Sequence, residues 1–127
     1  FGLQKNTLSK SLTDFMHQNK TQVISLTLDQ WLSTASQHKD AKLQSWCDDL
    51  IQKDFGLDVD MDVMADMGSS AQSPLGLSLM EVMSLITQLK RNPNLRYIHL
   101  CEGAPELGIY PAQVVKALGA LILGIVD

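Results

Sequence analysis

Several features on which specialised proteins depend are scarce in this sequence. The chain of 127 residues has only two cysteines, Cys47 and Cys101, without the short spacing of a metal-binding pair, which favours a reduced, cytoplasmic setting. Positive charge is also scarce, since 10 Lys and Arg against 14 Asp and Glu leave a net charge of −4, and the basic residues are scattered. The most apolar stretch, residues 111–126, contains Lys116 and is shorter than the roughly 20 residues of a membrane-spanning helix. We therefore expect neither nucleic acid nor membrane as a partner.

Residue types that mark common catalytic centres are sparse as well. The histidines show no HxxxH or HxH spacing, and we assign none of them to chemistry: His17, His38 and His99. His99, on a predicted strand, is expected to be a hydrogen-bonded core residue. The pair Ser69 and Ser70 lacks the context of a nucleophile elbow, which argues against a serine hydrolase. The methionines at 61, 64 and 67 are expected to fill packing gaps in the core.

The composition that remains is that of a globular protein, 45% apolar and 19% charged, at the length of one domain or a piece of one. Apolar residues with helical spacing alternate with short extended runs. Helices are predicted over residues 8–16, 28–32, 40–53, 79–89 and 111–126, and strands over 1–4, 23–26, 57–64 and 95–101. This alternation predicts an α/β fold of three αβα layers, with a mostly parallel sheet covered by helices on both faces.

Local signals fix where some of these helices begin. Thr27 with Gln30, and Ser78 with Glu81, have the spacing of capping boxes, in which the first side chain and the third helical residue satisfy each other's backbone N–H groups. Pro111 suits the first position of the last helix, where its missing N–H costs nothing. We expect that helix to turn an apolar stripe inward: Val114, Val115, Leu118, Leu121, Ile122 and Ile125.

Carboxylates follow two of the predicted strands, at the sheet edge where parallel α/β proteins bind ligands. Asp58, Asp60 and Asp62 lie in the predicted strand 57–64, and Glu102 follows the strand 95–101. Alternate strand residues share a face, so Asp60 and Asp62 are predicted to lie side by side, where repulsion favours a hard cation such as Mn²⁺ or Mg²⁺. The alternative is that these acids are solvated loop residues, with Glu102 a helix cap.

Three motifs, in order, resemble the C-terminal half of the arginase family, the ureohydrolases, and among them the formimidoylglutamase-like members. Residues 60–64 (DMDVM) are similar to the family's strand-terminal DxD motif. The loop 68–77 (GSSAQSPLGL) resembles its G-x-S-A-x-x-P-x-G-L loop, and Glu81 matches the acid of the following helix. Residues 102–107 (EGAPEL) are similar to its E-x-N-P segment. The match covers about residues 55–125.

The resemblance implies a dimanganese hydrolase that cleaves a linear guanidino, amidino or formimino C–N bond with a metal-bridging hydroxide. It implies Asp60 and Asp62 as metal ligands and Glu102 as the residue that contacts the substrate; pairing Asp58 with Asp60 is the other possible register. The chain departs from the family because Ala104 replaces the usual Asn and because it has neither the family's upstream histidine after a glycine run nor its D-x-H-x-D motif. We therefore expect this chain to be inactive by itself.

Three functions remain open. The parent protein is a hydrolase and this chain, which begins at Phe1 and not at Met, is its C-terminal part, able to self-associate through exposed strand edges. The alternative is a truncated, non-catalytic arginase-like module with a binding or structural role. A receiver-like Mg²⁺ domain would also place aspartates at strand ends, but it predicts a Lys after a later strand, and none follows residues 95–101.

Overall fold

The structure of the chain, a computed structural model, describes residues 9–19, 27–34, 36–50 and 53–127. These residues fall into two compact units, Phe1–Lys39 and Asp40–Asp127. The strands predicted at 1–4 and 23–26 lie outside the described residues. All the carboxylates singled out above belong to the second unit.

The first unit contains short helices whose starts follow from local capping. In α1 (Lys10–Gln18) the N-cap Ser9 side chain accepts a hydrogen bond from the Leu12 backbone. In α2 (Leu28–Leu32) the capping box of Thr27 and Gln30 is present, as predicted. Helix α3 (Ser36–Leu50) begins in this unit and continues into the second, starting earlier than the predicted helix 40–53.

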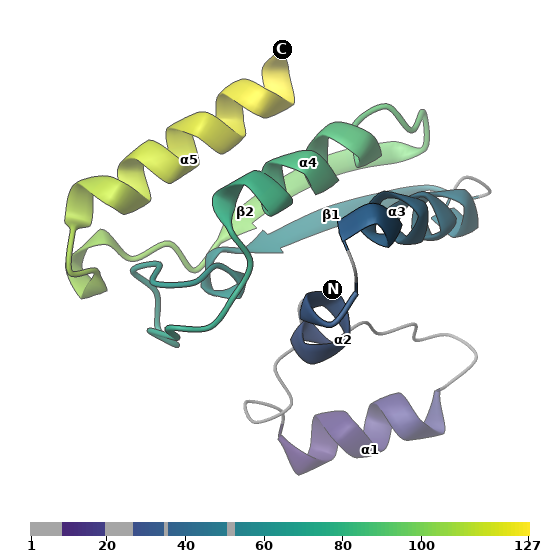
Figure 1. Cartoon of the computed structure of the whole chain (residues 1–127), viewed down its shortest axis with the longest axis horizontal. Helices are drawn as coiled ribbons and strands as arrows, with labels where there is room; N and C mark the ends of the chain where they lie inside the picture. The colour runs from purple at the N-terminus through teal and green to yellow at the C-terminus, as the bar shows by residue number, and fades with distance from the viewer. Residues whose placement is uncertain (1–8, 20–26, 35, 51–52) are drawn as a thin grey trace. The chain divides into compact units, whose positions relative to one another are not determined.

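The second unit is built on two parallel strands joined through a helix, so the chain has a mixed α/β fold (Figure 1). Its elements in order are β1 (Phe55–Asp60), η2 (Met61–Val63), α4 (Leu79–Leu89), β2 (Leu95–Cys101), η3 (Pro105–Leu107) and α5 (Pro111–Val126). The strands pair from Gly56 opposite Tyr97 to Asp60 opposite Cys101, with an irregularity between Phe55 and Gly56. Both strands therefore end at the same edge of the sheet.

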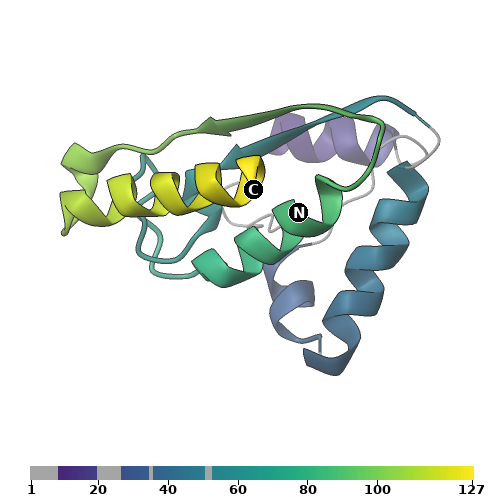
Figure 2. The same ribbon diagram turned by 90° about the horizontal axis from the view of Figure 1, so that it is seen from above.

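Helices α4 and α5 lie next to each other on one face of the two strands (Figures 1 and 2). Their starts match the predictions: Ser78 and Glu81 form a capping box, and Pro111 stands at the beginning of α5. The core on this face consists of buried apolar side chains from the strands, the loop and both helices. It includes Val59, Met61, Met64, Met67, Leu77, Val82, Ile86, Leu89, Val114 and Leu121.

The opposite face of the sheet is polar. Asp58, Tyr97 and His99 are exposed there, and the side chains of Asp58 and His99 pair at 3.1 Å. The prediction that His99 is a hydrogen-bonded core residue is therefore correct for the hydrogen bond and wrong for the burial, because its side chain is 62% exposed.

The strand predicted over residues 57–64 is shorter than expected. It ends at Asp60, whose side chain accepts a hydrogen bond of 3.1 Å from the Asp62 backbone and caps the 3₁₀ turn η2. This local hydrogen bond competes with the strand ladder, as aspartate side chains commonly do. Asp60 and Asp62 are thus neighbours across a turn, and not two residues on one strand face.

Helix α5 is covered along a narrower stripe than its sequence predicts. Val114 and Leu121 are buried as expected, but Val115 is 59% and Ile122 50% exposed. The covered stripe passes instead through Ala117, because α4 and the loops pack against one side of the helix only. None of the described helices is long and apolar enough to cross a membrane.

Candidate functional site

The acids predicted from the sequence meet at the carboxyl edge of the sheet. Asp60 is the last residue of β1, and its partner across the ladder is Cys101, the last residue of β2. Glu102 follows Cys101 directly, and Asp62 lies in the turn that follows Asp60. The expectation of a common edge is met, because in-register parallel strands leave their carboxyl ends together.

Burial and crowded negative charge at this edge raise the pKa of two of its groups, Asp62 and Cys101. The pKa of Asp62 is raised above its usual value, first by burial and then by repulsion from Asp60, a hydrogen bond between the two carboxyls and the charge of Glu102. The pKa of the Cys101 thiol is raised for related reasons, first its loss of water contact and then the charges of Asp60 and Glu102. A positive charge bound at this edge would favour the ionised carboxylates.

The backbone of Glu102 has an unusual conformation. Its φ of 61° lies in the left-handed region, which residues other than glycine rarely adopt. Its carboxylate accepts a hydrogen bond of 3.3 Å from the hydroxyl of Ser70, a residue of the loop before α4. Such conformations persist where surrounding contacts enforce them, and they are common at functional sites.

Direct backbone contacts join the loop before α4 to the loop after β2. The Ala104 N–H donates to the Gly68 carbonyl at 2.8 Å. A Cβ atom on Gly68 would lie 2.8 Å from the Ala104 carbonyl oxygen and 2.9 Å from the Gly108 Cα, so only glycine allows this approach. The contact places Ser70 next to Glu102, and two of the three arginase-like motifs are in contact as a result.

Asp58 stands two residues before Asp60 on β1, so the two share a strand face. Asp58 points to the open face of the sheet, where it pairs with His99, and it is the partner of His99 in the strand register as well. Asp60 and Asp62, by contrast, are in hydrogen-bond contact with each other through the Asp62 backbone. The choice of Asp60 with Asp62 over Asp58 with Asp60 stays a prediction.

The fit of these acids to a metal centre is incomplete. Carboxylate oxygens suit hard ions such as Mn²⁺, which take about six ligands. Within residues 9–19, 27–34, 36–50 and 53–127, however, no three His, Cys, Asp or Glu side chains are placed to share one metal ion. The described residues thus offer part of a cation site and do not fit a dimetal centre without further ligands.

From the sequence, no role at the site was predicted for Ser70, and none for its buried neighbour Ser69. Ser70 holds Glu102, as described above. Ser69 is only 1% exposed, and its hydroxyl has no hydrogen-bond partner among the described residues. The position of both serines in the 68–77 motif was the signal that could have indicated a role other than that of a nucleophile.

No protein-family model matches this chain. A comparison with curated protein sequences likewise finds no match.

Proposed function

We propose that this chain is the C-terminal part of an arginase-type dimanganese hydrolase that acts on a linear guanidino, amidino or formimino C–N bond. In this proposal Asp60 and Asp62 contribute to metal binding, and Glu102 contacts the substrate. The observation that carries it is the meeting of these three acids at the carboxyl edge of two parallel strands. The three-layer arginase-like fold, with a further helical layer on the open face of the sheet, and a cytoplasmic setting belong to the same proposal.

The role of Glu102 follows from the chemistry of the substrate class. A protonated amidine or guanidine carries several N–H donors and a positive charge, which a carboxylate binds through charge-assisted hydrogen bonds. The Ser70 hydroxyl and the joined loops hold this carboxylate in place beside Asp62. Because the described residues complete no metal centre, this chain alone is expected to catalyse no hydrolysis.

Titration of the chain with Mn²⁺, followed by the electron paramagnetic resonance signal of the free ion, tests the proposed ligands. We expect weak binding, with a dissociation constant in roughly the millimolar range, because most ligands would be water. Asp60→Asn and Asp62→Asn are each expected to weaken it severalfold. Asp58→Asn is the matched control, since it removes the same charge from the open face, and it should leave the affinity close to that of the wild type.

Equal affinities for all three variants, or no binding by the wild-type chain, would contradict the assignment of Asp60 and Asp62. A second assay measures release of product from formimidoylglutamate, arginine and agmatine with Mn²⁺ present. No turnover is expected from this chain by itself. Clear turnover would show that the site is complete without further ligands and would overturn the partial-site proposal.

The alternative is a truncated, non-catalytic arginase-like module with a binding or structural role. It is favoured by the lack of a D-x-H-x-D motif in the sequence and by the lack of three grouped metal-binding side chains among the described residues. The genomic sequence upstream of Phe1 separates the two possibilities. An in-frame D-x-H-x-D motif there supports the hydrolase, and a stop codon in its place supports the module.

A further inference from the structure

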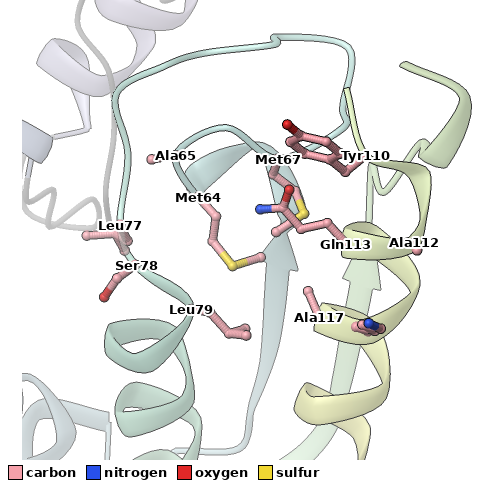
Figure 3. Close-up of a pocket in the computed structure, with 11 residues that line it drawn as sticks. Met64, Ala65, Met67, Leu77, Ser78, Leu79, Tyr110, Ala112, Gln113 and Ala117 are labelled. Carbon is pink, nitrogen blue, oxygen red and sulfur yellow. The ribbon is translucent and has the colours of Figure 1, made fainter. Parts of the chain in front are cut away.

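A cavity of about 500 Å³ opens between the beginnings of α4 and α5 (Figure 3). It lies on the helix-covered side of the sheet, and none of the acids at the carboxyl edge lines it. The loop after β1 supplies one wall and the first turns of α5 supply the other. The cavity is therefore separate from the candidate hydrolase site.

The floor of the cavity is apolar and buried. Met64, Met67, Leu77 and Ala117 line it, and each of these residues is at most 5% exposed. In Figure 3 the side chains of Met64 and Met67 point into the space between the two helices. A volume of this size is within the range of pockets for small molecules, and methionine side chains adapt to ligands of different shape.

The polar lining residues are Ser78 at the start of α4, Tyr110 just before α5, and Gln113 and Lys116 on α5. Gln113 and Lys116 are three residues apart on the helix and share one face of it. The Gln113 amide extends over the opening in Figure 3, and Tyr110 adds a phenol at the rim. Within the described residues, Lys116 makes no ion pair, so its ammonium group is free to meet an anion.

No acidic side chain lines the cavity, although the chain as a whole carries a net charge of −4. Two acids lie close to lining residues in the sequence. Asp66, between Ala65 and Met67, is exposed. The carboxylate of Glu81 turns back to the Ser78 backbone N–H and hydroxyl, at 2.9 Å each, and caps α4. In the part of the chain that the structure describes, the cavity thus combines an apolar floor with the ammonium group of Lys116 and the amide of Gln113. This combination fits a ligand with an apolar body and a single negative charge.

We propose that this cavity binds a small carboxylate with an apolar body, the size of a medium-chain fatty acid or an arylalkanoic acid. The apolar body lies on Met64, Met67 and Leu77, and the carboxylate accepts hydrogen bonds from Lys116 and Gln113. This site does not depend on the proposed hydrolase function, because it shares no residue with Asp60, Asp62 or Glu102.

Two-dimensional ¹H–¹⁵N NMR titrations of the whole chain with octanoate, and with octanamide as the neutral isostere, test the proposal. Octanoate is expected to shift resonances around Met64 and Gln113 and to bind about fivefold more tightly than octanamide. Lys116→Gln should bring the two affinities together. Arg91→Gln, which removes an exposed positive charge at the far end of α4, is the matched control and should preserve the preference for octanoate.

A second variant keeps the test independent of Lys116. Ala112→Glu places a negative charge at an exposed cavity-lining position in the first turn of α5, where an acid also suits the helix dipole. It should weaken octanoate binding at least as much as Lys116→Gln does while the spectrum of the folded protein persists. The proposal is overturned if both ligands bind the wild type equally, if Lys116→Gln and Ala112→Glu preserve the preference, if the shifts map to the outer face of α5, or if octanoate does not bind.

Discussion

The two faces of the β1–β2 sheet differ in burial and polarity. On the face covered by α4 and α5, strand residues such as Val59 meet helix residues such as Ile86 and Leu121 in an apolar core. On the other face, Asp58 and His99 form a polar pair that is exposed to water. The acids of the candidate site lie at the end of the sheet, between these two environments. The apolar burial that stabilises the unit is thus concentrated on the helix-covered side. Like charges at the edge cost less than they would in the core, because water still reaches them.

Truncation of one leucine in α5 tests this comparison most strongly. Leu121 is 0% exposed, so Leu121→Ala removes buried methyl groups and leaves a cavity, with an expected loss of about 2–5 kcal/mol of unfolding free energy. Leu123→Ala, two residues away and 60% exposed, makes the same chemical change at a site that is largely solvated, and it should cost less than about 1 kcal/mol. Urea denaturation measures both. Similar losses would show that the outer side of α5 is also buried.

Two glycine substitutions compare the packed loop with the open side of α5. A Cβ atom on Gly76 would overlap the backbone of Ala65 and Val63, both of which hydrogen-bond to Leu77, so Gly76→Ala is expected to cost about 1–3 kcal/mol. A Cβ atom on Gly119 meets no atom within 4 Å, and alanine favours a helix interior, so Gly119→Ala should stabilise the protein by about 0.5–1 kcal/mol. In thermal unfolding followed by circular dichroism, the midpoint should fall for Gly76→Ala and rise for Gly119→Ala. A destabilising Gly119→Ala would contradict the open surface of α5.

The acidic edge predicts a smaller effect that depends on pH. The pKa of Asp62 is raised in the native chain, so the native chain binds the proton of this carboxyl more tightly than the unfolded chain does. The resulting gain in unfolding free energy is complete below the usual aspartate pKa. It is lost as the pH rises through the native pKa. At neutral pH the ionised Asp62 is therefore a net cost.

The variant Asp62→Asn is expected to raise the unfolding free energy at neutral pH and to change it little in strong acid. Denaturation curves across this pH range measure the difference. Asp58→Asn serves as the control, because it removes a charge on the open face, and it should give no such pH-dependent gain. A loss of stability for Asp62→Asn at neutral pH would contradict the crowding of charge at this edge.

The smallest effect is expected at the ion pair of Asp54 and Arg96, on the surface near the start of both strands. The hydrogen bond from Arg96 lowers the pKa of Asp54. Any contribution of this pair to stability is therefore present at neutral pH, and it disappears as the pH falls through the lowered pKa. Because both side chains are mostly exposed, water and salt screen the pair. Asp54→Asn should leave the thermal midpoint unchanged within error, and a clear decrease would show that this corner of the sheet is buried in a larger assembly.

The sequence predicted the helices of the second unit well and the sheet less well. The starts of α4 and α5 were given by Ser78 with Glu81 and by Pro111, and the structure has both helices where they were expected. The end of β1 was misplaced because the alternation of aspartates and apolar residues continues past Asp60 into a 3₁₀ turn. The capping hydrogen bond from Asp62 to Asp60 gives no periodic signal that could have revealed this turn.

For the candidate site, the sequence located the acids but not their supports. The positions of Asp60 and Glu102 at strand ends predicted a shared edge. The roles of Ser70 and Gly68 depend on contacts between loops more than thirty residues apart, which no local pattern encodes. The cavity between α4 and α5 was also unforeseen, because the methionines that line it look in sequence like ordinary core residues.

What the sequence by itself determined in this protein is local: helix starts, the helical spacing of residues 79–89 and the presence of acids after strand-like segments. These features depend on residues within about four positions of each other, and their hydrogen bonds form within one turn of the chain. Only the tertiary structure decided which strands pair, which side of α5 is covered and how close Asp62 lies to Glu102. The physical reason is that such contacts join distant segments, and their free energy depends on burial and charge that exist only once the chain has folded.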